Sequence, residues 1–388
     1  MTIAFTFEIF LPVVNGVITV TSSIASVLSD QGHKVIFIIP RMHNSPTVVS
    51  DKRILILSVP SIHSFLYPGL RLVAPFSSLL RQYLIGEKVN ILHITGPGSL
   101  SYAALRVARK LCIPIVHTWH TMLSDPGYLR MAVFFPPLIP IIQSMATYYY
   151  RPFVRNVTMT APGAAAKDFL QSLSSIPYVH SIRNGIDLAR LKSYDSFQKL
   201  QAQYPLFNRK TFVFIGRVSV EKAINVLIYI FKRVIRKDPD IRLFVIGEGP
   251  QLYKMQKLTA MLSLSNIVFT GALKHHDVLQ KGFLQHARAF VTSSTSEAQS
   301  MVQIESLAAG TPIIAFNDSA NKDVVGDAGI LVKENDIQAF EHACIKITHD
   351  AALWKSLKEK ALQRSMLFDI RVVTQQIINI YQSLYSEE

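Results

Sequence analysis

Short apolar runs alternate with longer stretches of helical periodicity along most of this chain. In the first half, four apolar runs predict strands and two amphipathic stretches predict helices. The predicted strands are Thr2–Phe7, Lys34–Ile39, Asn90–Thr95 and Ile113–His117, and the predicted helices are Gly16–Ser29 and Ser99–Leu111. Apolar strands separated by helices are typical of parallel sheets that are covered on both faces.

The second half repeats this scheme. Its predicted strands are Thr211–Ile215, Arg242–Ile246, Asn266–Phe269, Ala289–Thr292 and Thr311–Phe316, and its predicted helices are Glu221–Lys237, Pro250–Leu262, Asp277–His286 and Met301–Ala309. Two such sheets predict an α/β protein with two Rossmann-like, doubly wound domains that face a ligand cleft. The length of 388 residues suits two domains, which we place at residues 1–187 and 188–369. The expected linker is Asp187–Tyr194, after the turn at Asn184-Gly185.

The chain is strongly basic, with 40 lysine and arginine residues against 26 aspartate and glutamate residues. Residues 1–187 hold 15 basic against 7 acidic residues, and residues 188–388 hold 25 against 19. Such an excess favours anionic partners, namely nucleotide phosphates, anionic lipid headgroups or nucleic acid. Nucleic acid is disfavoured, because the chain has no RNP-like aromatic motif, no Cys/His finger and no basic run longer than two residues.

Cysteine use and the N-terminal residues indicate a reducing compartment. Cys112 and Cys344 are the two cysteines, and both lie in apolar surroundings, so no disulfide framework is implied. The segment Met1–Val14 contains Glu8 and Pro12 and no basic residue, so it fits a buried strand better than a signal peptide. We therefore expect a cytoplasmic protein.

Two carboxylates, Glu297 and Glu305, flank the start of a predicted helix. They lie eight residues apart, between the apolar strand Ala289–Thr292 and an Ala/Leu-rich stretch. A strand, polar turn and helix in an open parallel sheet present the helix N-terminus to an anionic ligand. The two carboxylates are separated by at most roughly 12 Å of helix, which suits a sugar nucleotide held at both ends. The alternative is a buried helix that carries two solvated acids.

A second cluster lies further upstream. Gly216-Arg217 follows the predicted strand Thr211–Ile215, and Glu221-Lys222 opens the next helix. Arg217 and Lys222 thus lie on one strand-to-helix turn. There the planar guanidinium of Arg217 and the ammonium group of Lys222 can bind a diphosphate together. Gly-Arg and Glu-Lys pairs are common at solvated helix starts. Either cluster alone is therefore weak evidence for a ligand site, whereas the two clusters together are specific.

With these motifs the chain resembles the retaining glycosyltransferases of the GT-B fold, family 4, whose signature is a Gly-Arg…Glu-Lys turn followed by Glu-x7-Glu. The resemblance covers nearly the whole chain and includes Asn15-Gly16, Gly32-His33, His117–Thr121, Asn184–Asp187 and Ala308–Pro312. It implies that the first domain binds the acceptor and the second the nucleotide sugar. It also implies that the final helix, within residues 370–388, packs back on the first domain.

The resemblance further implies a donor site. Its residues are Gly16, Arg217, Lys222, Ser300 and Met301 for the diphosphate, Glu305 for the ribose, Thr270 and Leu273 for the nucleobase, and Glu297 and His120 for the donor sugar. Catalysis then depends on cations and backbone dipoles that stabilise the leaving diphosphate, with His120, Glu297, Arg217 and Lys222 as the catalytic set. The alternative for His120 is a core histidine bonded to backbone, and His117 is expected to be structural. We expect no metal ion and no other cofactor.

Two positions depart from the family pattern. Ala223 stands where Gly is usual after Glu-Lys, and Ser300 stands where Gly is usual after the first Glu. Serine keeps its backbone N–H and suits a helix N-terminus, so we expect a narrower pocket that still binds the donor.

The segment Leu129–Tyr150 is unusually apolar, and Met131–Ile142 within it holds no charge. Its three prolines and its length exclude a membrane-spanning helix. One interpretation is a buried loop and core helix, and the other is a surface that lies on an anionic membrane. The basic excess favours the second, with Tyr148–Tyr150 at headgroup level. The expected membrane and acceptor residues are Arg130, Met131, Phe134, Phe135, Tyr148, Arg151 and Arg155.

Within the family, the motifs Phe10–Val17, His117–Thr121 and Ser296–Gln299 look most like diacylglycerol α-glucosyltransferases. We therefore expect a retaining, metal-independent hexosyltransferase that moves glucose from UDP-glucose to a lipid acceptor, diacylglycerol being favoured. It would act as a monomer or weak oligomer, peripherally bound at the cytoplasmic face of the membrane. The alternative is a GDP-mannose-dependent α-mannosyltransferase that acts on a lipid or glycan. A nucleic-acid-binding protein and a non-catalytic membrane protein are remote alternatives.

Overall fold

The chain divides into two compact units, each described here by itself. The computed structural model describes residues 1–10, 16–41, 48–51, 54–64, 71–74, 78–120, 139–172, 178–294 and 299–386. Unit 1 comprises Met1–Gly185 and Ile370–Glu388, and unit 2 comprises Ile186–Asp369. The boundary lies after Gly185, two residues before the position expected from the sequence. The expected linker Asp187–Tyr194 therefore belongs to unit 2.

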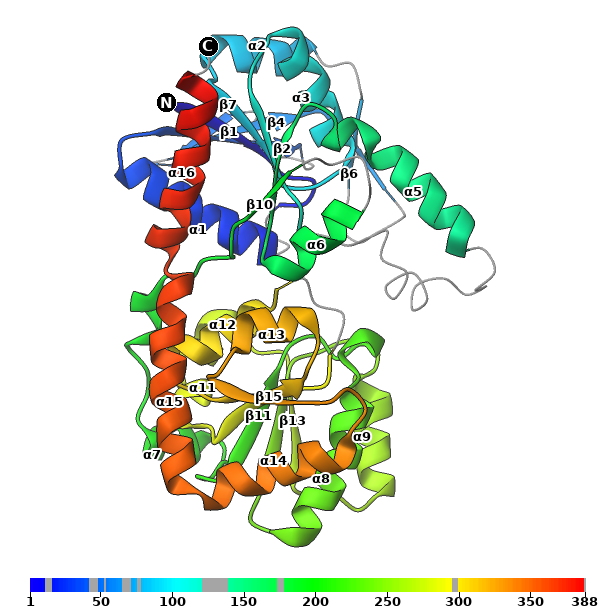
Figure 1. Cartoon of the computed structure of the whole chain (residues 1–388), viewed down its shortest axis with the longest axis vertical. Coiled ribbons are helices and arrows are strands. Elements are labelled where there is room, and N and C mark those ends of the chain that lie inside the picture. The colour runs from blue at the N-terminus through cyan, green and yellow to red at the C-terminus, as the bar shows by residue number, and fades with distance from the viewer. Residues whose placement is uncertain are drawn as a thin grey trace. The chain divides into compact units, whose positions relative to one another are not determined.

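Unit 1 is built on a sheet that is parallel except at one edge (Figure 1). In spatial order its strands are β10 (Val179–Ser181), β9 (Thr158–Ala161), β8 (Ile115–Thr118), β7 (Ile91–Ile94), β1 (Thr2–Thr6), β2 (Lys34–Pro40), β4 (Ile54–Val59) and β3 (Val48–Asp51). The chain winds outward in both directions from β1 and β7, so the topological switch point lies between these two strands. A separate hairpin pairs β5 (Ser61–His63) with β6 (Arg71–Val73).

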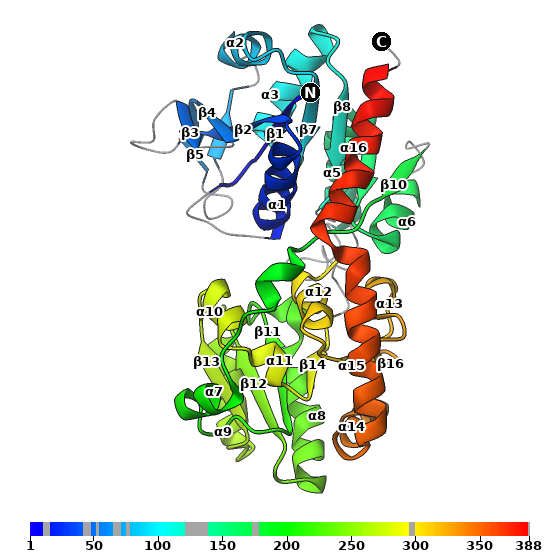
Figure 2. The same ribbon diagram turned by 90° about the vertical axis from the view of Figure 1, so that its left-hand side faces the viewer.

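Helices cover both faces of this sheet. They are α1 (Gly16–Asp30), α2 (Ser78–Gly86), α3 (Ser99–Lys110), α5 (Ile139–Val154), α6 (Ala164–Ser172) and α16 (Ile370–Ser386). Helices α1 and α16 pack side by side on one face, whereas α2 and α3 cover the other (Figure 2). Where α16 enters unit 1, a Cβ on Gly185 would lie 2.9 Å from the Cα of Ile370, so the Asn-Gly turn requires glycine.

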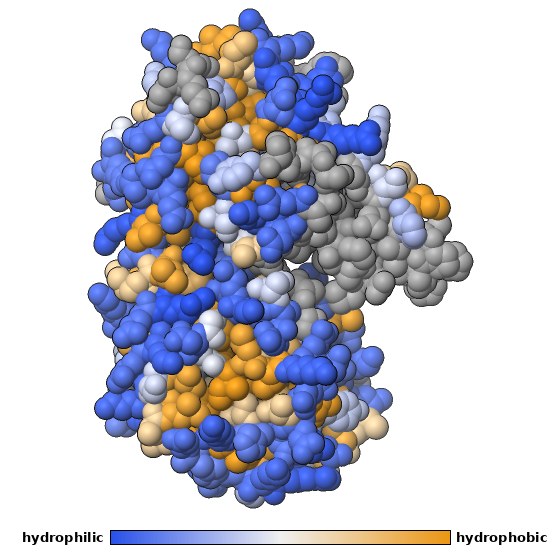
Figure 3. Space-filling view, viewed as in Figure 1, coloured by the Kyte–Doolittle hydropathy of each residue, from blue (hydrophilic) through white to orange (hydrophobic). Residues whose placement is uncertain are grey.

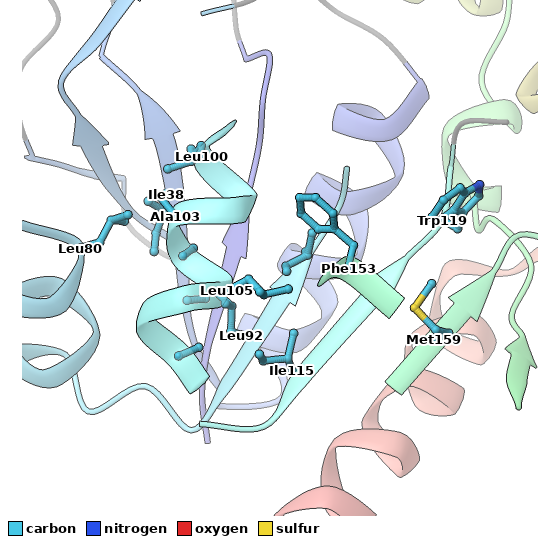
Figure 4. Packing of buried hydrophobic residues seen from close by; sticks show 14 of the residues in the cluster. Ile38, Leu80, Leu92, Leu100, Ala103, Leu105, Ile115, Trp119, Phe153 and Met159 are labelled. Carbon is cyan, nitrogen blue, oxygen red and sulfur yellow. The ribbon is translucent and has the colours of Figure 1, made fainter. Parts of the chain in front are cut away.

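The core of unit 1 forms because side chains of each strand alternate between the two sheet faces. Figure 4 shows part of the cluster on one face, with labels on Ile38, Leu80, Leu92, Leu100, Ala103, Leu105, Ile115, Trp119, Phe153 and Met159. Tyr150 belongs to the same cluster, with its ring 4.6 Å from that of Trp119. The prediction that Tyr150 lies at a membrane headgroup level is therefore wrong. Residues two apart on a helix point to different sides, so α5 buries Tyr150 and exposes Tyr148.

Unit 2 has a fully parallel sheet. In spatial order its strands are β13 (Ile267–Gly271), β12 (Arg242–Ile246), β11 (Thr211–Ile215), β14 (Ala289–Thr292), β15 (Ile313–Phe316) and β16 (Gly329–Val332). This is the strand order of a dinucleotide-binding fold, with the switch point between β11 and β14.

The helices of unit 2 also lie on both faces of its sheet (Figures 1 and 2). They are α7 (Phe197–Gln203), α8 (Ile224–Lys237), α9 (Leu252–Met261), α10 (His275–Gln280), α11 (Phe283–His286), α12 (Met301–Ala308), α13 (Ser319–Val325), α14 (Ile337–His349) and α15 (Ala351–Ser365), with 3-10 turns η2 (Leu188–Leu191), η3 (Val220–Lys222) and η4 (Met366–Phe368). On β11, Phe212 and Phe214 pack against α8 and α14, while Val213 packs against the layer of α11 and α12.

Two predicted helices are interrupted by residues with positive φ. The predicted helix Asp277–His286 is α10 and α11, which are separated at Gly282 with a φ of +75°. The predicted helix from Glu221 begins as α8 at Ile224, because Ala223 is left-handed, with φ 49° and ψ 39°. Glycine adopts this conformation without a Cβ penalty, which explains the glycine that is usual in the family at the position of Ala223.

Replacing Ala223 with glycine is expected to stabilise unit 2. The left-handed conformation costs an L-residue roughly 1–2 kcal/mol, and the greater freedom of glycine in the unfolded chain cancels about half of that gain. We therefore expect Ala223→Gly to raise the free energy of unfolding by about 0.5–1 kcal/mol in urea denaturation. Ala260 is exposed within the regular helix α9, so Ala260→Gly should lower it by about 1 kcal/mol. A lower midpoint for both variants would contradict the strain at Ala223.

Candidate functional site

Both sequence clusters of the second half lie at the switch point of unit 2. Gly216-Arg217 follows β11, and Ser293-Ser294 follows β14 shortly before α12. The carboxyl edge of a doubly wound sheet opens a crevice at the switch point, which is where such folds bind ligands. The structure therefore places Arg217 and the N-terminus of α12 at the edge where an anionic ligand would enter.

Serine hydroxyls join the two clusters. Ser293 Oγ donates to the carbonyl oxygens of Lys222 at 3.2 Å and Ala223 at 2.9 Å, and Ser294 Oγ donates to that of Glu221 at 3.2 Å. The loop after β14 thus fixes the backbone of the turn that carries Lys222. These serines were not predicted as site residues, although their position directly after a buried strand marks them.

The two cations of this turn differ in environment. Arg217 is exposed, so its guanidinium can reach a ligand in solvent. Lys222 is half-buried, and burial lowers the pKa of its ammonium group while Glu221 opposes that effect. A partly desolvated ammonium interacts more strongly with a phosphate than a fully hydrated one does.

The turns after β11 and β12 are hydrogen-bonded to each other. Val218 N donates to Glu248 O at 2.8 Å, and Gln251 N donates to Val218 O at 3.0 Å. A Cβ on Gly247 would lie 1.9 Å from Gly216 O, and one on Gly249 would lie 2.3 Å from Val218 O. Both glycines are therefore required for the close approach that holds Arg217 in place. The Gly-Glu-Gly sequence after β12 is the signal that could have predicted this role.

Glu305 lies on α12, nearly buried at 6% exposure, and has a partner that was not predicted. His275 Nε2 lies 2.7 Å from Glu305 Oε1. The hydrogen bond to Glu305 raises the pKa of His275 above its ordinary value, although burial acts in the opposite direction. His275 follows the turn with Thr270 and Leu273, so the residues expected to bind ribose and nucleobase lie on adjoining elements.

The start of α12 is described from Gln299 onward. Ser300 is the N-cap residue and Met301 the first helical residue, and both are partly exposed. Their backbone N–H groups belong to the first turn, where a helix offers donors to an anion. Glu297 lies outside the described residues, so its predicted contact with the donor sugar stays a prediction.

Three residues of unit 1 were given roles from the sequence, namely His120 at the donor sugar, Gly16 at the diphosphate and His117 as a structural residue. His120 lines a narrow cavity with His93, Thr160 and Asn184. Burial, with a smaller contribution from His117, lowers the pKa of His120 to about 4, so its imidazole is neutral near pH 7. His117 is fully buried with Nδ1 3.1 Å from Phe153 O, which confirms its predicted structural role. Gly16 is exposed at the first residue of α1.

The switch point of unit 1 is occupied by the protein's own carboxyl group. Glu8 follows β1, and its side chain accepts hydrogen bonds from the backbone N–H of Ser101 at 2.8 Å and Leu100 at 3.3 Å, in the first turn of α3. A Cβ on Gly98 would lie 2.0 Å from Glu8 Cδ. Burial raises the pKa of Glu8, and the hydrogen bonds from α3 oppose this.

The predicted membrane residues are described only in part. Arg130, Met131, Phe134 and Phe135 lie outside the described residues. Tyr148, Arg151 and Arg155 are exposed on or just after α5, and the Arg151 guanidinium stacks 5.4 Å from the Tyr148 ring. Figure 3 shows apolar side chains on the outward end of α5. Within the described part of the chain, no helix has the length and apolar character needed to cross a bilayer.

The expectation of a metal-free site assumed that the chain has no Asp-x-Asp pair, but the sequence contains one at Asp238-Pro239-Asp240. It precedes β12 and so lies at the amino edge of the parallel sheet, opposite to the donor clusters. Lys210 Nζ lies 2.9 Å from Asp238 and 3.2 Å from Asp240, so these carboxylates are paired with a cation. Among the described residues, no three histidine, cysteine or acidic side chains group as metal ligands would.

Comparison with known proteins agrees with this architecture. A family model described as Glycosyltransferase Family 4 matches residues 14–190, and one described as Glycosyl transferases group 1 matches residues 196–364. Sucrose-phosphate synthase from Thermosynechococcus elongatus has the same fold, with a TM-score of 0.78 at 18% identity over 100% of both chains.

Curated relatives include enzymes of glycolipid synthesis. The alpha-monoglucosyldiacylglycerol synthase of Streptococcus pneumoniae is 27% identical over 82% of this chain and 72% of that protein. The protein of the same name from Acholeplasma laidlawii is 28% identical over 85% and 84% of the two chains. A GDP-mannose-dependent alpha-mannosyltransferase of Mycobacterium tuberculosis is 26% identical over 88% and 85%. Because the two family models together account for most of the sequence, and both units have the expected parallel sheets, the chain belongs to the GT-B glycosyltransferases of family 4.

Proposed function

We propose that this glycosyltransferase moves a hexose from a nucleotide sugar to a membrane lipid with retention of anomeric configuration, and that UDP-glucose and diacylglycerol are its substrates. One observation carries the donor half of this proposal. The turn with Arg217 and Lys222 is bonded to the loop before α12 at the switch point of unit 2, and Glu305 lies about one turn into that helix.

The leaving group explains this choice of residues. Departure of a nucleoside diphosphate places negative charge on the β-phosphate, and fixed cations and helix dipoles stabilise that charge. Arg217 offers a fork of N–H donors, Lys222 a partly desolvated ammonium, and Ser300 and Met301 the backbone N–H groups of a helix N-terminus. In this proposal these groups replace a metal ion.

The proposed transfer is a single exchange of bonds. The acceptor hydroxyl oxygen forms a bond to the anomeric carbon as the bond from that carbon to the β-phosphate oxygen breaks. The hydroxyl proton passes to an oxygen of the departing diphosphate. Attack on the face that the leaving group vacates gives retention without a protein nucleophile. Glu297 and the neutral His120 would orient the donor sugar, and Gly16 would contribute a backbone N–H to the diphosphate.

Two alternative donors follow from the relatives. The two relatives named as synthases of monoglucosyldiacylglycerol favour glucose, whereas the relative named as a mannosyltransferase favours GDP-mannose. The identity of the donor sugar nucleotide is therefore the first property to determine.

Incubation of the purified protein with diacylglycerol vesicles and UDP-glucose should yield a glucolipid with an α-linkage, resolved by thin-layer chromatography and proton NMR. Product should still form in excess EDTA, because Arg217 and Lys222 supply the positive charge. A mannolipid from GDP-mannose, with no glucolipid, would establish the alternative donor. Loss of activity on chelation that magnesium or manganese restores would disprove the metal-free diphosphate site.

Lys222→Ala and Glu305→Ala should each lower kcat/KM for the donor by at least about 30-fold. Loss of one buried charged contact costs roughly 2–5 kcal/mol, and 2 kcal/mol corresponds to about that factor. Lys254→Ala, which removes an exposed lysine of α9, should leave kcat/KM unchanged. Near-normal activity of either site variant at saturating acceptor would remove that residue from the donor site.

The surface of α5 supports docking on a membrane. Ile141, Met145 and Tyr148 are 58%, 68% and 71% exposed, and their spacing of four and three residues places them on one side of the helix. Arg151 and Arg155 continue beyond them and are exposed. An apolar stripe followed by arginines fits the interface of an anionic bilayer, so we propose that unit 1 binds the membrane peripherally through α5.

The triple change Ile141→Ser, Met145→Ser and Tyr148→Ser should reduce sedimentation with vesicles at every salt concentration, because it removes apolar burial. Changing Arg151 and Arg155 to Ser should weaken binding only to anionic vesicles at low salt, by about 1 kcal/mol per charge. Tyr253→Ser with Met261→Ser, which alters exposed apolar residues of α9, is the matched control. If the triple variant sediments as the parent does, α5 is not the docking surface.

A further inference from the structure

The carboxyl group of Glu305 is nearly buried and has one nitrogen partner that stands at the rim of the site. Among the described residues, the side chain that hydrogen-bonds this carboxyl group is His275, with its Nε2 2.7 Å from Oε1. The Glu305 side chain is 7% exposed, whereas that of His275 is 54% exposed. The pair therefore connects the interior of α12 to solvent at the start of α10.

A buried carboxylate must be hydrogen-bonded or paired, and its geometry is then set by its partner. His275 takes Oε1, which leaves Oε2 as an acceptor for a further donor. The two hydroxyls of a ribose are such donors. A carboxylate held on one oxygen by a ring nitrogen cannot rotate freely, so it presents Oε2 in a fixed direction.

The charges around His275 come from three elements. Glu305 on α12 is hydrogen-bonded to its ring. The positive charge of Arg190 in η2 has the opposite effect on the His275 pKa to that of Glu305. His276 and Asp277 are the next two residues of α10. Glu305 raises the pKa of the imidazole, while burial and Arg190 lower it, and the net direction is upward from 6.5. The hydrogen bond to Glu305 therefore favours the protonated form of the ring.

We propose that His275 is a positioning residue for the donor ribose: it fixes Glu305 through Oε1, and its protonation strengthens binding of the anionic donor. The inference rests on the proposed function, in which Glu305 binds the ribose. The protonated ring cancels the charge of Glu305. When the ring loses its proton, the site gains one unit of net negative charge, so donor affinity falls as the pH rises through the pKa of His275.

The test is the dissociation constant of UDP-glucose, or of GDP-mannose if that is the donor, measured without acceptor by calorimetry from pH 5.5 to 8.5. The diphosphate of a nucleotide sugar is a diester and keeps a constant charge in this range. For the parent chain the constant should rise roughly three- to tenfold, as expected for one charge several ångströms away in a half-exposed site. In His275→Gln, which keeps an N–H donor but does not titrate, the profile should be flat. His276→Gln, in the next residue, should behave like the parent.

Steady-state kinetics supply a second readout. The variant His275→Ala should raise KM for the donor several-fold with little change in kcat, because it loosens binding without removing a reacting group. If His275→Gln keeps the pH profile of the parent, or weakens binding equally at every pH, the positioning role is overturned while the donor site stands. If the parent binds neither nucleotide sugar, the donor site itself is overturned, and the role of His275 with it.

Discussion

Two serine hydroxyls that donate to three carbonyl oxygens, one of them sharing its hydrogen between two, hold the site of unit 2 together. Ser293 and Ser294 lie directly after β14, and their hydroxyls donate to the carbonyl oxygens of residues 221–223. The turn after β11 is also hydrogen-bonded to the turn after β12. Because β11 and β14 are the strands on either side of the switch point, these bonds connect the two halves of the crevice. They hold the cationic turn against the strand that leads toward α12.

This connection also explains how an alanine is retained in a left-handed conformation. Ser293 bonds the carbonyl oxygen of Ala223, and Val226 N donates to the same oxygen at 2.8 Å. These two hydrogen bonds help to hold Ala223 in the left-handed conformation, whose steric cost in free energy a glycine would avoid. The strain is local to the residue after Lys222, where the backbone must reverse before α8 begins.

Sequence reasoning predicted five of the six described strands of unit 2, because these five are apolar runs bounded by turns, and it missed the edge strand β16. β11, β12 and β14 begin and end at the predicted residues, and their order places Arg217 and Lys222 beside α12. The strands β5 and β6, of three residues each, are too short for a periodic pattern to reveal. The first-half helix α5 was predicted only as one of two alternatives, since its apolar residues serve both the core and the surface.

Contacts that tertiary packing creates lay beyond sequence reasoning. The pairing of His275 with Glu305 joins elements 30 residues apart, and no spacing rule connects them. The inward orientation of Tyr150 on α5 also depends on its packing against Trp119. The Gly-Glu-Gly turn was visible in the sequence, but its reason, the backbone of Gly216 lying where a Cβ would stand, required coordinates.

A protein made of two similar sheets inherits two crevices in which a helix N-terminus faces the switch point. Glu8 makes the two halves unequal. In unit 1 its carboxyl group already satisfies the N–H groups of Leu100 and Ser101. A phosphate entering there would have to displace this group from its two backbone N–H donors. The N-terminus of α3 is thus capped by the chain's own carboxyl group, whereas among the described residues Ser300 makes no side-chain cap hydrogen bond at the N-terminus of α12.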